Sequence, residues 1–338
     1  MKRGAKTALI LVFLAFAFTV LLFLQLRWAQ LWPLSPKEVW DALTGKDRFY
    51  RVVVVDINLT RVLFGLIVGA GLAASGAVMQ ALFKNPMASP YTLGLSSGAS
   101  FGAALGILFP VAFIPTIASV PLLAFIFCLG TMFLVYSIAR VGNQTHMETL
   151  LLAGIAVAAL FQAAVSLLTY LAGEKTHDIV YWGMGNLSVT MPWTKLPVVI
   201  ILAMIGILVM FYYSKDLNVM MLGDAHAMDL GVDVKKTRLT LLIASSLTTA
   251  ACVCFVGTIG FVGLVIPHIL RIMLGPDNRL LIPMCVITGG VYLMGCDYLA
   301  HLSAASLGVL PIGVVTSLIG APYFIYLLMR RKREVGWM

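Results

Sequence analysis

Long runs of apolar residues, separated by short stretches of charged or turn-forming residues, extend over almost the whole chain. A helix needs about 20 largely apolar residues to cross a bilayer, because each residue adds about 1.5 Å along its axis. The pattern predicts about ten membrane-spanning helices, some short enough to be tilted, broken or buried behind others. They are Thr7–Trp28, Val62–Phe83, Leu93–Leu108, Ile117–Ala139, Thr149–Ala172, Pro197–Tyr213, Leu239–Gly257, Phe261–Leu274, Leu280–Asp297 and Leu307–Met329.

Composition supports this interpretation, because 61% of the 338 residues are hydrophobic and 11% are charged. A soluble domain has about a quarter of its residues charged. The first apolar run follows Lys2, Arg3 and Lys6, as in a signal peptide, but it is longer than a signal-peptide core and lacks a small-x-small cleavage site. We therefore expect an all-α membrane protein with a single transmembrane domain over 1–338 and with the first helix retained.

The distribution of lysine and arginine predicts the orientation. With the N-terminus in the cytoplasm and ten crossings, 15 of the 23 basic residues fall inside, as the positive-inside rule requires. Both termini are then cytoplasmic. The net charge of +9 comes from lysines and arginines that cluster at the ends of the predicted spans. We therefore expect a lipid bilayer as partner and no nucleic acid.

Two hydrophilic segments are long enough to have a role of their own. One is the external segment 30–60, which mixes charges of both signs with aromatic residues. The other is the cytoplasmic segment 214–236, which has a helical pattern. Loops beyond about 12–15 residues usually bind or gate something, although either segment could be a simple connection.

Motifs for chemistry are missing from the sequence. It has no phosphate-binding loop, so energy from ATP would have to come from a partner, and no zinc-protease or serine-hydrolase signature. The five cysteines lie scattered in apolar segments, which predicts neither a disulfide framework nor a metal site. We expect no cofactor, no metal and no catalytic residue.

Polar and irregular positions within the apolar runs are the candidates for a transport path. Ser96, Ser97 and Ser100 follow a stretch rich in small residues and could line a polar path, or simply allow tight packing. In the turn after the second span, Asn85 and Met87 lie beside two prolines that interrupt the helix. They are gate candidates, against the alternative of an ordinary turn.

Several segments together resemble a known family. Arg61-Val-Leu, Ser75–Gln80 and Asn85–Ala88 resemble the second span and following turn of the FecCD-type permeases of ABC importers, which take up ferric siderophores, haem and vitamin B12. Thr258–Arg271 resembles their eighth helix. The remaining matches are Leu151–Gly154, Leu310–Thr316 and Gly320–Ile325. The motifs run in order from about Arg61 to Arg330 and are closest to the vitamin B12 permease type.

This resemblance implies the type II ABC importer fold, with two permeases, a cytoplasmic ABC ATPase dimer and an external substrate-binding protein. A second copy of this chain is the simpler expectation for the other permease, and a heterodimer stays open. The family's coupling helices, which contact the ATPase, match a short part of the cytoplasmic segment. The coupling candidates are Leu222, Gly223, Asp224, Ala227, Met228, Leu230 and Gly231.

The resemblance also implies gates and docking positions. Gates lie at the Asn85–Met87 turn and at Met147 and Glu148, where Glu148 could instead cap the fifth helix. Arg61 keeps one of three arginine positions at which the family docks its binding protein. Asn58 and His301 stand where the other two are expected, which leaves the docking mode open, and nearby Arg48 or Arg51 could substitute.

We interpret the chain as the transmembrane permease subunit of an ATP-driven importer in the cell membrane, with no enzymatic activity of its own. The expected cargo is an iron complex (siderophore or haem) or a cobalamin-like compound. Two alternatives remain: a permease of the same fold for a molybdate- or tungstate-type oxyanion, and an ion-coupled secondary transporter. The absence of paired charges within the spans counts against the second.

Overall fold

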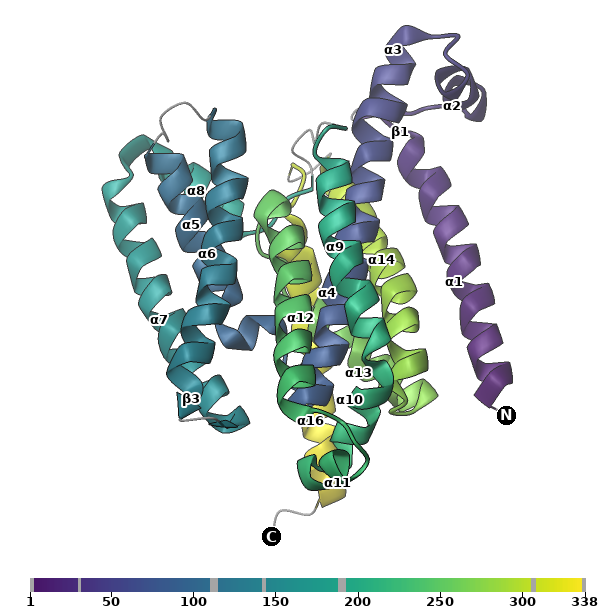
Figure 1. Cartoon of the computed structure of the whole chain (residues 1–338). Coiled ribbons are helices and arrows are strands. Elements are labelled where there is room, and N and C mark those ends of the chain that lie inside the picture. Colours follow the sequence, from purple (N-terminus) through teal and green to yellow (C-terminus); the bar gives the residue numbers. More distant parts are fainter. Residues whose placement is uncertain are drawn as a thin grey trace.

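The computed structural model describes residues 3–29, 32–109, 115–141, 144–187, 193–304 and 308–335. Gln30, at the start of the predicted external segment, and Leu307, at the start of the last predicted span, lie outside these residues. Almost all of the described chain is helical, and the helices run side by side (Figure 1). This confirms the predicted all-α class.

Each of the ten predicted spans corresponds to an apolar helix. In the described part of the chain, six helices are long and apolar enough to cross a membrane, and α9 with α10 would make a seventh span, bent by 52°. Three further apolar helices are shorter. The ten are α1 (Arg3–Leu26), α4 (Thr60–Leu82), α5 (Leu95–Leu108), α6 (Thr116–Ala139), α7 (Met147–Leu171), α9 (Leu196–Tyr212), α12 (Val234–Val256), α13 (Val262–Leu274), α14 (Asn278–Leu302) and α16 (Ile312–Val335).

Short elements connect these helices. Two pairs of two-residue antiparallel strands follow α1 and α6. The short helices are α2 (Pro36–Leu43), α3 (Arg48–Arg51), the π-helix η1 (Val52–Leu59), the 3-10 helices η2 (Pro90–Leu93) and η3 (Gly173–Lys175), α8 (Thr176–Gly183), α10 (Ser214–Met221) and α11 (Asp224–Asp229). The strands are β1 (Trp28–Ala29), β2 (Trp32–Pro33), β3 (Arg140–Val141) and β4 (Gln144–Thr145).

The second span begins well before Val62, where the sequence pattern placed its start. The helix is continuous over Arg48–Leu82, so the second half of the external segment belongs to it. The polar residues Asp56 and Asn58 interrupt the apolar pattern in this stretch. In the structure, Asn58 is buried and its amide donates to the carbonyl oxygens of Leu26 and Trp28, at 3.3 and 2.7 Å. Because that polar group has partners, it can lie inside a helix bundle.

Helix α4 forms the centre of the main bundle, and most of its residues are buried. Glycines allow neighbouring helices to approach it closely. A Cβ on Gly69 would lie closer than 3.0 Å to the backbone of Gly289 on α14, and a Cβ on Gly76 would collide with the backbone of Gly263 on α13. Such close backbone contact is typical of helix packing in membranes, where small residues let helices meet.

The helices form two groups (Figure 1). Helices α5 to α8 lie together on one side of the main bundle, which contains α4, α9, α12, α13, α14 and α16, while α1 lies at the opposite edge. Helix α11, the start of α1 and the end of α16 lie at one end of the molecule, which we call the α11 end. Helices α2 and α3 lie at the other, which we call the α2 end.

Candidate functional site

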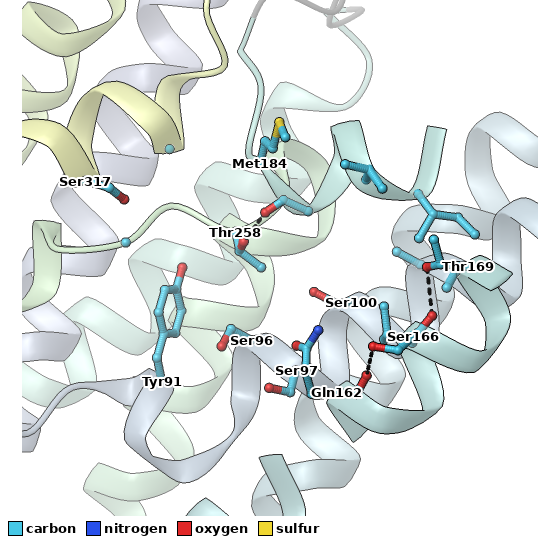
Figure 2. A pocket seen from close by; sticks show the side chains of 18 of the residues that line it. Tyr91, Ser96, Ser97, Ser100, Gln162, Ser166, Thr169, Met184, Thr258 and Ser317 are labelled. Carbon is cyan, nitrogen blue, oxygen red and sulfur yellow. Dashed lines mark hydrogen bonds between the residues drawn. The ribbon is translucent and has the colours of Figure 1, made fainter. Parts of the chain in front are cut away.

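A cavity of about 920 Å³ opens between α5, α7, α8 and the start of α16 (Figure 2). Its polar groups are hydroxyls and one amide, and none of the described side chains in its wall is charged. The wall includes the three serines singled out in the sequence. The polar side chains are Tyr91, Ser96, Ser97, Ser100, Gln162, Ser166, Thr169, Thr258 and Ser317.

Helix α5 presents its serines to the cavity because its opposite face is pressed against α6. Cβ atoms on Gly98 and Gly102, one helical turn apart, would lie closer than 3.0 Å to atoms of α6. Residues four apart share one face of a helix, so these glycines fix the face that α6 covers. Ser96, Ser97 and Ser100 lie half-buried on the other side, in the cavity wall.

The short helix α8 forms another wall of the cavity, and the sequence pattern missed it. Ile179, Val180 and Met184 line this cavity, while other residues of the same segment line a small neighbouring cavity of about 450 Å³. The predicted spans leave 173–196 without an element. The signal that could have identified the helix is the apolar run Ile179–Trp182 between two glycines, Gly173 and Gly185.

Three glycines from separate segments meet at the end of α8. Cβ atoms on Gly185, Gly257 and Gly313 would each collide with a backbone carbonyl of the neighbouring segment. The hydroxyl of Thr258 donates to the carbonyl oxygen of Gly183 at 2.6 Å. The motifs around Thr258 and Gly313 therefore hold the end of α8 against the main bundle, beside the cavity.

The predicted gate residues lie in two turns at the α11 end. Asn85 follows the end of α4, and its side-chain oxygen accepts a hydrogen bond from the backbone N–H of Met87 at 2.9 Å. Met147 and Glu148 are the first two residues of α7, and Glu148 is exposed. In the described chain, none of the four lines the large cavity.

The predicted coupling segment contains a short helix, with exposed apolar side chains beside exposed His226 and Asp229. Leu222, Met228 and Leu230 are 72%, 61% and 67% exposed at α11, whereas Ala227 is fully buried against the rest of the chain. Three exposed apolar side chains around a single short helix form the kind of patch that marks an interaction surface.

Helix α11 is held in place by its ends. Gly223 and Gly231 precede and follow it with φ of 132° and 83°, values that favour glycine. Asp224 at its start forms an ion pair with Arg238 of α12, at 2.6 Å between Oδ2 and Nη2. Movement of α11 would therefore act directly on α12.

The neighbouring helix α10 is tied to the start of α14. The side-chain oxygen of Asn218 accepts two hydrogen bonds from Asn278, both at 2.8 Å, and its amide donates to Asp277 at 2.7 Å. Arg279 also donates two hydrogen bonds to the Asp277 carboxylate. The hydrogen bonds from Arg279, supported by that from Asn218, hold the pKa of Asp277 well below its usual range.

A buried polar cluster joins α1, α4 and α14 near the α2 end. The Nε atom of Arg61 lies 3.1 Å from the Asp297 carboxylate, and its Nη1 atom lies 2.6 Å from His301. The amide of Gln25 also donates to Asp297 at 3.0 Å. All four side chains are buried, so the cluster satisfies its charges within the chain.

The three predicted docking residues are therefore internal in this structure. Arg61 and His301 belong to the buried cluster, and Asn58 bonds to the end of α1. None of them presents its side chain at the surface, whereas Arg48 and Arg51 nearby are exposed. The docking role of the three stays a prediction.

The described residues contain no cluster of metal-binding side chains. No group of three His, Cys, Asp or Glu side chains that could hold an ion occurs among them. All five cysteines are buried and unpaired with one another.

Comparison with known proteins agrees with this geometry. The chain is 41% identical to the cobalamin import system permease protein BtuC of Halobacterium salinarum, over 88% of this chain and 80% of that protein. It is 37% identical to the hemin transport system permease protein HmuU of Yersinia pestis, over 89% of this chain and 90% of that protein. A solved inward-facing structure of an ABC transporter assigned to the metal-chelate type matches with a TM-score of 0.83 and 31% identity, over 95% of this chain and 99% of that one.

The chain is thus a multi-pass membrane protein and the permease subunit of an ABC importer, with a transport role rather than a catalytic one. A permease of this kind works with an ATPase and with a substrate-binding protein. The family model of the FecCD transport family matches residues 14–330. The chain therefore belongs to the FecCD transport family.

Proposed function

We propose that this permease imports a large metal chelate, either cobalamin-like or an iron complex such as haem or a siderophore, with cobalamin the first compound to test. The observation that carries the proposal is the 920 Å³ cavity, whose described wall carries hydroxyl groups and one amide among apolar side chains, and no charge. A bulky chelate with an apolar body and many weak hydrogen-bonding groups suits such a wall. The volume, rather than the missing charge, favours a chelate over a small divalent oxyanion, because an oxyanion can also accept hydrogen bonds from neutral donors.

The cavity supports a pathway shared by two permeases. It is lined by one side of α5, α7, α8 and α16, so a second copy of the chain placed opposite would enclose a larger central space. We propose a homodimer with Ser96, Ser97 and Ser100 lining this path. The gates at Asn85, Met87, Met147 and Glu148 would close it at the α11 end, which we propose is cytoplasmic together with both termini.

Uptake by the reconstituted importer tests the cargo. The permease, its ATPase and its binding protein are placed in proteoliposomes, and ATP-dependent uptake of cobalamin, haem, a ferric siderophore and molybdate is compared. We expect uptake of one of the large chelates. Uptake of molybdate alone would contradict the proposed cargo class, and cross-linked Met147→Cys pairs between two copies would support the homodimer and the gate.

The exposed surface of α11 is the proposed contact with the ATPase. A buried contact made by Leu222, Met228 and Leu230 would tolerate no charge, because burying an unpaired carboxylate is costly. Met228→Glu and Leu230→Glu should therefore abolish co-purification of the ATPase and ATP-driven uptake. Lys215→Glu places the same carboxylate at an exposed position of α10, with a larger total change in charge, and serves as the control. Normal coupling in both α11 variants would refute this contact.

Docking of the binding protein is proposed to use exposed charges. Because Arg61 is committed to the buried pair with Asp297, we propose that Arg48 and Arg51 supply the positive charges at the α2 end. Exposed ion pairs contribute about 0–1 kcal/mol each, so the double reversal Arg48→Glu with Arg51→Glu should weaken binding measurably where single changes do not. Unchanged affinity for the binding protein would rule these residues out.

A further inference from the structure

A second cavity, of about 680 Å³, lies between α1 and the main bundle. Its described walls come from α1, α4, α9 and α14 and consist of aliphatic side chains, one phenylalanine and glycine. Leu14 and Phe18 of α1 face Ile67 of α4 and Gly290 of α14 across it. The volume is within the range of about 300–1,000 Å³ typical of small-molecule sites.

Contacts near the α2 end fix the depth of this cavity. The amide of Gln25 donates to Asp297 and to the carbonyl oxygen of Met294, both at 3.0 Å, and Leu21 lies beside Gly295. Gln25 and Leu21 of α1 therefore lie beside the last turns of α14. The α1 residues of the wall lie around the middle of that helix, so the cavity lies at the depth of the hydrocarbon core.

Helix α1 packs against the bundle along one narrow face, through Leu14, and its polar contacts lie at one end. Gln25 is fully buried in the polar cluster, yet over the apolar window of α1 the share of buried residues is 6%. Val12 and Phe16, which flank the cavity on α1, are each 68% exposed. The cavity is therefore continuous with the lipid-facing surface of α1.

Two cations lie toward the α11 end of the cavity. Lys6 lies five residues before the first cavity-lining residue of α1, and Arg279 lies seven before the first of α14, or roughly 10 Å along each helix at 1.5 Å per residue. Both are exposed, although Arg279 also pairs with Asp277. This is the level at which the phosphate of a phospholipid lies when its acyl chain reaches the middle of the bilayer.

We propose that this cavity is a phospholipid site, with one acyl chain between α1 and the bundle and the headgroup phosphate near Lys6 and Arg279. Within the hydrocarbon core no hydrophobic force closes such a gap, since lipid tails are as apolar as the side chains. An acyl chain restores the dispersion contacts that an empty cavity loses. The bound lipid would hold α1 against the bundle below its polar contacts at Gln25 and Leu26.

Filling the cavity tests the proposal. Ala15 lines the cavity, whereas Leu9 is 62% exposed on another side of the same helix and outside the cavity wall, so Leu9→Trp is the control for Ala15→Trp. The full-length chain is washed extensively in detergent, and retained phospholipid is measured by phosphorus assay and native mass spectrometry. We expect one phospholipid to remain on the wild type and on Leu9→Trp, and retention to fall about ten-fold in Ala15→Trp.

Further variants keep the test decisive. If Ala15→Trp fails to fold, Ala15→Leu fills less space and should give a smaller loss of lipid. Lys6→Ala should reduce retention of phosphatidylglycerol when it is added back. Equal retention in all variants would overturn the proposal. Disulfide-linked dimers of Ala15→Cys in membranes would also overturn it, because a protein segment would then occupy the cavity. None of these measurements depends on ATP or on the proposed cargo.

Discussion

The contact between α4 and α13 at Gly76 predicts a large effect from a single methyl group. In Gly76→Ala the new Cβ would overlap the backbone of Gly263, far inside the 3.0 Å that real Cβ atoms respect. The atom in the way is a backbone carbonyl, so no side chain can rotate to make room and the two helices must separate. Forcing an extra methyl group into a well-packed core costs about 1–3 kcal/mol, and occasionally more.

The free energy of unfolding of the purified chain, measured by denaturant titration in mixed micelles, tests this prediction. Gly130→Ala on α6 is the control, because a Cβ there meets no atom within 4 Å. That substitution should be neutral or stabilising by up to about 1 kcal/mol, since alanine is the better helix former. The reasoning fails if Gly76→Ala is as stable as Gly130→Ala, because α4 and α13 would then not meet at these glycines.

Three further predictions concern the buried cluster, the α14 cap and the pathway. Asp297→Asn leaves Arg61 buried without its counter-ion and should cost about 3–5 kcal/mol of unfolding free energy, whereas Asp178→Asn, at a side chain that is 67% exposed, should cost almost nothing; equal effects would contradict the buried pair. The pKa of Asp277 is lowered in the folded chain, chiefly by hydrogen bonds from Arg279. Its ionised form therefore stabilises the fold above the unfolded pKa of about 4, and this contribution is lost as the pH falls below that value. Asp277→Asn should flatten the acid limb of stability against pH, with Asn218→Ala acting in the same direction, and an unchanged limb would show that the hydrogen bonds are not formed. Ser100→Trp should reduce cargo uptake by narrowing the cavity, whereas Ser137→Trp, on an exposed position of α6 outside the cavity wall, should not; equal uptake by both would remove Ser100 from the path.

Helix content and the order of spans could be predicted from sequence, because lipid imposes one strong rule. Backbone polar groups must be satisfied internally in hydrocarbon, so each long apolar run becomes a helix. The rule is weakest at span ends. Val52–Leu59 contains both apolar residues and polar ones, and the decision to extend the helix rests on partners for Asn58 that lie some thirty residues away.

Part of the candidate site could also be predicted. The exposed apolar residues around α11 follow from a short helical pattern flanked by glycines with special backbone conformations. Ser96, Ser97 and Ser100 could be singled out as polar residues among small ones. Their position in a cavity wall could not be predicted from sequence, because that position depends on which face of α5 is covered by α6.

The sequence by itself determined that the chain is a multi-span helical membrane protein of the permease type. Local periodicity and short motifs carry that information. The tertiary structure alone decided that Arg61 is an internal partner of Asp297 rather than a surface charge, and that α8 forms a wall of the cavity. Both outcomes depend on contacts between residues far apart in the chain. The spacing of apolar residues along the sequence indicates local helices and carries no information about such contacts.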